Sequence, residues 1–131
     1  MDSNQIFRSC CTSNDLQVVK ENAIRCKDIN SRDRLTGRTA LHNAAFFGCF
    51  DVVKYLVLEL KMDPNVKDWQ GDLPIHDAIR FGYDNIVRFL GKRGRTNTTL
   101  KNLLGENPID TAISYSNHGL IKHLPVSRER L

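Results

Sequence analysis

Apolar side chains recur along this chain at the spacing of short helices, and the pattern returns every 34 residues. Small and apolar residues begin such a stretch at Ala40, Pro74 and Pro108. After a bend, each stretch is followed by a second apolar stripe at positions i, i+1 and i+4: Val52, Val53 and Leu56, then Ile86, Val87 and Leu90, then Leu120, Ile121 and Leu124. That spacing places one stripe of a helix against its neighbours. The pattern predicts stacked pairs of short helices.

Glycine and proline mark where each pair begins. Three glycines share one position of the 34-residue register, just before a helix start: Gly37, Gly71 and Gly105. Glycine fits a tight turn with positive φ, which costs other residues about 1–2 kcal/mol. Pro74 and Pro108 suit the first helical position, where a missing N–H costs nothing. Asn107 is a competent N-cap, whereas Leu73 is not, so we expect the helix after Leu73 to depend more on packing.

The register also extends backward into a degenerate first unit. Phe7 falls in the slot of Leu41, and Val18 falls in the slot of Val52. The second helix of this unit is more polar, because it carries Glu21 and Asn22, as the terminal cap of a solenoid should. The sequence therefore predicts four units, at about 3–30, 31–65, 66–98 and 99–124, with a frayed tail over 125–131.

The turn and first helix of the units carry a recognisable motif. They read T-G-R-T-A-L-H-N-A-A from Thr36, Q-G-D-L-P-I-H-D-A-I from Gln70 and L-G-E-N-P-I-D-T-A-I from Leu104. A period near 33 residues with a T-P-L-H-x-A core is the signature of stacked ankyrin units, so the chain resembles a small ankyrin-repeat protein. The resemblance implies an all-α repeat solenoid in a single domain over 1–131. Its helix-turn-helix units would be joined by β-turn or hairpin loops, with capping repeats at both ends.

Two joints depart from the regular pattern. The outer helix of the second unit is one residue longer than usual, and the third unit is followed by G-R-T-N-T-T from Gly94. We expect an ordered but irregular loop there. Pro125 should end the last helix.

Composition and the lack of targeting segments predict where in the cell the protein is found. The chain carries 19 Lys and Arg against 15 Asp and Glu, a net charge of +4. No apolar run approaches the roughly 18 residues of a membrane span, and the start M-D-S-N-Q lacks the blocks of a signal peptide. We expect a cytoplasmic and/or nuclear protein. Its four cysteines lack C-x-x-C spacing and are interpreted as reduced thiols, with Cys26 and Cys49 the more exposed.

Catalytic and metal-binding patterns are missing from the sequence. It has no G-x-S-x-G, no G-x-x-x-x-G-K-[ST] and no H-E-x-x-H, so we predict neither an enzyme nor a cofactor. His42 and His76 share one slot, where the resemblance implies a structural histidine bonded near the helix start rather than a metal ligand. His118 and His123 are interpreted as solvated surface.

The remaining functional signal lies on the surface. The resemblance implies a concave binding face made of the turn tips and the exposed side of each first helix. Phe47, Phe81 and Tyr115 repeat at one position and predict an aromatic ladder, unless the rings serve only to stabilise the stack. Trp69, at a turn tip, is a predicted contact residue because exposed tryptophan often dominates interface energy. The candidate partner-binding residues are Arg34, Arg38, Phe46, Phe47, Lys67, Trp69, Arg80, Phe81 and Tyr115.

The leading hypothesis is a non-enzymatic protein-protein interaction module, an adaptor or inhibitor. Its partner would be a protein with an acidic or mixed surface, and the chain by itself would be a monomer. Two alternatives stay open. The resemblance makes Asn65 and Asn30 candidate sites of asparagine hydroxylation. Aromatic residues among basic ones can stack on single-stranded nucleic acid, although no nucleic-acid motif accompanies them.

Overall fold

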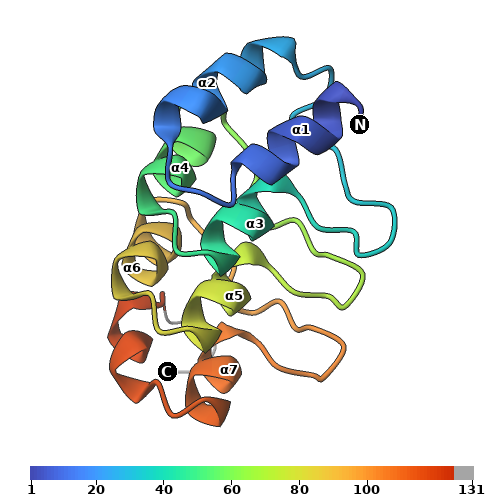
Figure 1. Ribbon diagram of the computed structural model, residues 1–131. Coiled ribbons are helices and arrows are strands. Elements are labelled where there is room, and N and C mark those ends of the chain that lie inside the picture. The colour runs from blue at the N-terminus through green and yellow to red at the C-terminus, as the bar shows by residue number, and fades with distance from the viewer. Residues whose placement is uncertain (126–131) are drawn as a thin grey trace.

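The computed structural model describes residues 1–125, which form four stacked pairs of helices and contain no strand (Figure 1). We number the pairs from the N-terminus. The pairs are α1 (Ser3–Cys10) with α2 (Leu16–Arg25); α3 (Ala40–Phe46) with α4 (Phe50–Lys54) and the π-helix η1 (Tyr55–Glu59); α5 (Pro74–Arg80) with α6 (Asp84–Lys92); and α7 (Pro108–Ser114) with the 3-10 helix η2 (His118–His123). The expected frayed tail lies outside the described residues, apart from Pro125.

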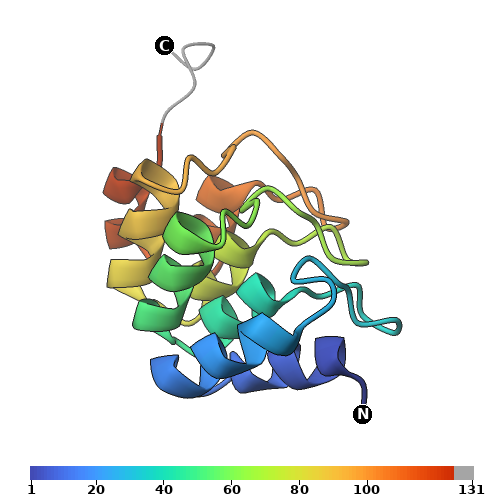
Figure 2. The ribbon, with the colours of Figure 1, turned by 90° about the horizontal axis from the view of Figure 1, so that it is seen from above.

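The helices form two layers. The first helix of each pair lies in an inner layer and the second in an outer layer, and the long turn loops project from the side of the inner layer (Figure 2). Because the pairs follow one another along the stack, each loop lies beside the loop of the next pair. This arrangement confirms the helical repeat predicted from the 34-residue period.

The helix starts follow the caps predicted from sequence. The Asn107 side chain accepts a hydrogen bond from the N–H of Asp110 at 2.9 Å, as an N-cap does. Leu73 has no side-chain oxygen, so the helix of the third pair begins without a side-chain cap. The N–H of Leu73 donates to Nδ1 of the buried His76 ring at 2.9 Å, as the N–H of Thr39 does to Nδ1 of His42 at 3.2 Å in the second pair.

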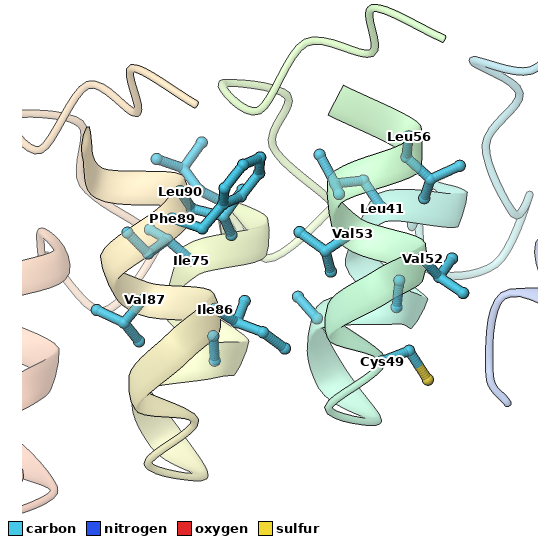
Figure 3. Packing of buried hydrophobic residues seen from close by; sticks show 14 of the residues in the cluster. Leu41, Cys49, Val52, Val53, Leu56, Ile75, Ile86, Val87, Phe89 and Leu90 are labelled. Carbon is cyan, nitrogen blue, oxygen red and sulfur yellow. The ribbon is translucent and has the colours of Figure 1, made fainter. Parts of the chain in front are cut away.

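A continuous apolar core runs from Phe7 in the first pair to Leu124 in the last. The outer helices supply apolar side chains to this core on two sides. Val52 and Ile86 point toward the preceding pair, whereas Val53 and Val87 point toward the following pair (Figure 3). Neighbouring residues of one outer helix thus join the pairs on either side of it.

Two predictions about exposure are wrong, and both fail because a neighbouring pair covers the side chain. Cys49 is 2% exposed and points toward the first pair (Figure 3). His123 is 7% exposed, and its Nε2 lies 2.9 Å from Oδ1 of Asp84 on α6. Neither contact is visible in the local pattern of the chain.

The irregular joints are ordered. The extra residue of the second outer helix is absorbed by η1, where the N–H of Leu60 donates to the carbonyl of Tyr55 at 3.1 Å. A single π-turn is the usual way to insert one residue into a helix. The last outer helix is 3-10 rather than α-helical. It is short and contains Gly119, a poor helix former, and Pro125 follows it closely.

Candidate functional site

Each turn tip is closed by its own polar residue. Asp33, Asp68 and Asn102 open the three turns, and each carbonyl accepts from the turn glycine, at 2.8, 2.9 and 2.9 Å. Their side-chain oxygens accept from the N–H two residues on, at 2.8, 2.9 and 3.0 Å. The turn glycines have φ values of +74°, +79° and +78°. Because side chain and backbone both close the turn, the tips are preorganised.

The tips are also bonded to one another. The N–H of Trp69 donates to the carbonyl of Thr36 at 2.9 Å, and the N–H of Leu103 donates to the carbonyl of Gln70 at 2.9 Å. Below them, Nε2 of His42 lies 2.8 Å from the Asp72 carbonyl. The three tips therefore form one continuous surface.

The two shared-slot histidines have the structural role expected of them. Nδ1 of His42 accepts the N–H of Thr39 at 3.2 Å, and Nε2 of His76 lies 3.1 Å from the Glu106 carbonyl of the next turn. Burial lowers the pKa of His42 to about 4, so the ring is neutral at physiological pH. Within residues 1–125, no three His, Cys, Asp or Glu side chains are grouped to hold a metal ion.

Trp69 is half anchored and half accessible. Its Nε1 donates to the carbonyl of Arg34 at 3.2 Å, and the Arg32 guanidinium lies 5.1 Å from the ring centroid. The ring also covers Gly37, since a β-carbon added at Gly37 would lie 2.4 Å from Cδ2 of Trp69. The side chain is nevertheless 53% exposed. Trp69 therefore connects the first and second turn tips and still exposes apolar surface to solvent.

The candidate contact residues predicted from sequence leave out three other apolar residues of the turn tips. Leu35 and Leu103 share the slot of Trp69 and are 90% and 78% exposed, and Leu104 is 79% exposed. The signal was present, since all three stand in a turn where polar residues are usual. A row of apolar side chains thus follows the tips from one loop to the next.

The aromatic residues meet differently from the predicted ladder. Phe47, Phe81 and Tyr115 are 54%, 50% and 51% exposed. Phe47 and Phe81 are connected through Phe46, whose ring centroid lies 5.0 Å from one and 4.8 Å from the other. Tyr115 instead lies beside Arg80, with the guanidinium 5.9 Å from the ring centroid. The inner helices thus present a cluster around Phe46 and a separate tyrosine.

Two of the candidate arginines are engaged inside the stack. Arg38 pairs with Asp68 at 3.0 Å and with Asp77 at 2.8 Å. Arg80 bonds both carboxylate oxygens of Asp72, at 2.8 and 2.9 Å. Burial acts to raise the pKa of Asp72, but the hydrogen bonds from Arg80 and Asn102 outweigh it and hold the pKa below its usual range. Much of the predicted positive charge of this face is therefore neutralised by buried carboxylates.

The remaining candidates lie on the same side of the molecule. Arg34 is exposed at the first tip. Lys67 is half-buried, and its Nζ donates to the Lys101 carbonyl of the next loop at 2.9 Å.

Shallow hollows separate the tips. One of about 240 Å³ is lined by Leu35, Thr36, Arg38, Asp68, Trp69 and Gln70. Another of about 340 Å³ is lined by Gln70, Asp72, Arg80, Asn102, Leu103 and Leu104. Each hollow is lined by exposed apolar side chains and by an arginine that is already paired with an aspartate, so each suits a single side chain of a docked surface.

The two candidate asparagines differ in accessibility. Asn65 is tied to the irregular loop, because its Oδ1 accepts the N–H of Asn97 at 2.6 Å. Asn30 is exposed, with its backbone N–H donating to Asp28 at 2.9 Å.

Comparison with known proteins agrees with the architecture. A family model described as ankyrin repeats (3 copies) matches residues 7–102. Over 62 residues, 47% of this chain, the sequence is 40% identical to the mitochondrial liver isoform of glutaminase of Rattus norvegicus and 39% identical to that of Mus musculus. The match spans only 10% of the length of each relative. In the part of the chain that the structure covers, no helix is long and apolar enough to cross a membrane.

Proposed function

This chain belongs to the ankyrin-repeat family, and we propose that it is a non-enzymatic protein-protein interaction module, an adaptor or inhibitor. We call its binding surface the concave face: the three turn tips together with the exposed side of α3, α5 and α7. The observation that carries the proposal is the row of exposed apolar residues on rigid tips, beside half-exposed aromatic rings.

The energetics favour recognition on this face. Exposed apolar side chains gathered in one place mark interaction sites on soluble proteins. Tryptophan, tyrosine and arginine carry most interface energy when a partner covers them. Because the tips are already closed by hydrogen bonds, little ordering entropy is lost on binding. The surface thus combines exposed apolar side chains with a low entropic cost of binding.

The pairing of Arg38 and Arg80 changes the kind of partner proposed. Their charges are compensated by Asp68, Asp77 and Asp72, so we place a mixed surface with apolar side chains ahead of a strongly acidic one. Exposed Arg34 still favours some acidic character near the first tip. We also place the protein in the cytoplasm or nucleus, in keeping with its four free cysteines.

The test is affinity capture from a lysate of the native source, read by mass spectrometry. The unaltered protein is compared with a triple variant, Trp69→Ala, Phe81→Ala and Tyr115→Ala, and with an outer-helix control, Arg88→Ala and Lys92→Ala. All three must give the same circular dichroism spectrum and comparable Tm values. Nuclease treatment of a parallel sample separates protein partners from nucleic acid.

We expect a protein that binds the unaltered chain and the control, and that is lost from the triple variant. Retention by the triple variant together with loss from the control would place binding on the outer helices and contradict the proposal. Loss of the captured protein after nuclease treatment would support nucleic-acid binding instead.

A further inference from the structure

The last pair leaves apolar side chains uncovered on the end of the stack. Ala45 and Ile79 occupy one slot of the register and are both 0% exposed, because the following pair covers them. Ile113 occupies the same slot in the last pair and is 52% exposed. The turn shows the same contrast. A β-carbon added at Gly71 would lie within 3.0 Å of the following loop, whereas a β-carbon added at Gly105 would have no atom within 4 Å.

The outer helices repeat this contrast. Val53 and Val87 point toward the following pair and are fully buried (Figure 3). Ile121 has their slot in η2 and is only partly buried. Ile113 and Ile121 therefore make up a C-terminal end face with the same slots that every internal joint buries.

The first pair leaves the opposite half of the joint uncovered. Val52 and Ile86 point toward the preceding pair and are 0% exposed, whereas Val18, in their slot, is 37% exposed. On the inner helices, Ala40 is fully buried, and Ile6 in its slot is 37% exposed. We call Ile6 and Val18 the N-terminal end face.

We propose that a second copy of this chain stacks its N-terminal end face on the C-terminal end face of the first. The occupant is a second copy because both halves of the joint are present on one chain. The contact repeats, at the slots of Ile6 and Val18, the interface that the four pairs already make inside the molecule, although polar Asn22 stands in the slot of the buried Leu56 and Leu90. The two end faces differ, so the contact is head-to-tail, and a head-to-tail contact that does not close grows into linear stacks. The proposal differs from the monomer expected from sequence.

The association should be weak. Internal joints also include bonds between neighbouring turn tips, such as Trp69 to Thr36. Ile6 and Val18 lie on the helices α1 and α2, so the N-terminal end face contains no turn-tip residue to pair with the Gly105 loop. An interface limited to two short helices lies at the small, transient end of the size range. Stacking is thus expected to depend steeply on protein concentration.

Sedimentation velocity of the full chain under reducing conditions tests the proposal. The weight-average mass should rise progressively between about 10 µM and about 1 mM, the range of weak association. Ile113→Glu removes the C-terminal end face, and Val18→Glu removes the N-terminal one. Both positions are partly exposed, and circular dichroism confirms that each variant folds. Leu35→Glu, at a turn tip that is 90% exposed, is the matched control.

Each glutamate variant alone should stay monomeric at concentrations where the unaltered protein and Leu35→Glu associate. A mixture of the two should form dimers and nothing larger, because each variant keeps the face that the other lacks. A monomer at every concentration would overturn the proposal. So would a Val18→Glu variant that still dimerises, because that result indicates a symmetric contact. The concave face takes no part in this joint, so either proposal can fail without the other.

Discussion

At the scale of single residues, the turn glycines differ in what surrounds them. Gly37 and Gly105 have nearly the same φ, +74° and +78°. The Trp69 ring covers Gly37, whereas the space around Gly105 is open to 4 Å. At Gly105, glycine is required only by the positive φ of the backbone. At Gly37, it is required both by the positive φ and by the close packing of the Trp69 ring.

This contrast predicts unequal costs for the same substitution. Gly105→Ala should lower the free energy of unfolding by about 1 kcal/mol, the cost of a β-carbon at positive φ. Gly37→Ala should cost more, about 2–3 kcal/mol, because its β-carbon also displaces the Trp69 ring. Urea denaturation of the two variants measures both values. Equal losses would mean that the tryptophan does not pack on this turn.

A second prediction at this scale concerns pH. The pKa of His42 falls from 6.5 to about 4 on folding because the ring is buried. Between these values the unfolded chain binds a proton that the folded chain does not, so the stabilisation is complete above pH 6.5 and is lost as pH falls toward 4. The destabilisation caused by His42→Gln should therefore be smaller at pH 5 than at pH 7.5, by about 1–2 kcal/mol.

Urea denaturation at the two pH values provides the measurement. Burial raises the pKa of Asp77 to about 6, so Asp77 shifts stability in the opposite direction, favouring the fold as pH falls. Both proteins contain Asp77, and the comparison cancels its effect. An equal loss at both pH values would show that His42 is not buried as a neutral ring.

At the scale of elements, periodicity predicts most of the structure because helix pairing depends on residues close in sequence. The starts at Pro74 and Pro108 follow from local residues and agree with the structure. The 3-10 form of η2 and the burial of Cys49 and His123 do not follow. These features depend on contacts with a neighbouring helix pair, and such contacts cannot be predicted from the local sequence pattern.

The irregular loop after α6 allows a test of one such long-range contact. Asn65 Oδ1 accepts the N–H of Asn97 at 2.6 Å, and Asn97 Oδ1 in turn accepts the N–H of Thr99 at 3.0 Å. Asn65→Ala should lower the free energy of unfolding by about 1 kcal/mol and speed amide exchange at Asn97. Asn30→Ala is the matched control, since Asn30 is exposed in the corresponding D-x-N turn. Unchanged exchange at Asn97 would contradict this account of the loop.

At the scale of the whole molecule, the exposure of the candidate residues was easier to predict from the sequence than their charge. The register puts Phe47 and Phe81 in one slot and Trp69 at a turn tip, and all three side chains are about half exposed. The sequence gives no indication that Arg38 would pair with carboxylates 30 and 39 residues away. A formal charge of +4 therefore exaggerates the attraction of this face for an acidic partner. Apolar contact is the larger expected contribution.

The central claim is that a partner covers the concave face. Hydrogen exchange of the chain, alone and saturated with the captured partner, tests it most directly. We predict slower exchange at the three turn tips, at 33–37, 68–71 and 102–105, and at the ends of α3 and α5, with the outer helix α6 unchanged. Protection confined to α6 and the other outer helices, with the tips exchanging as in the free chain, would contradict the claim.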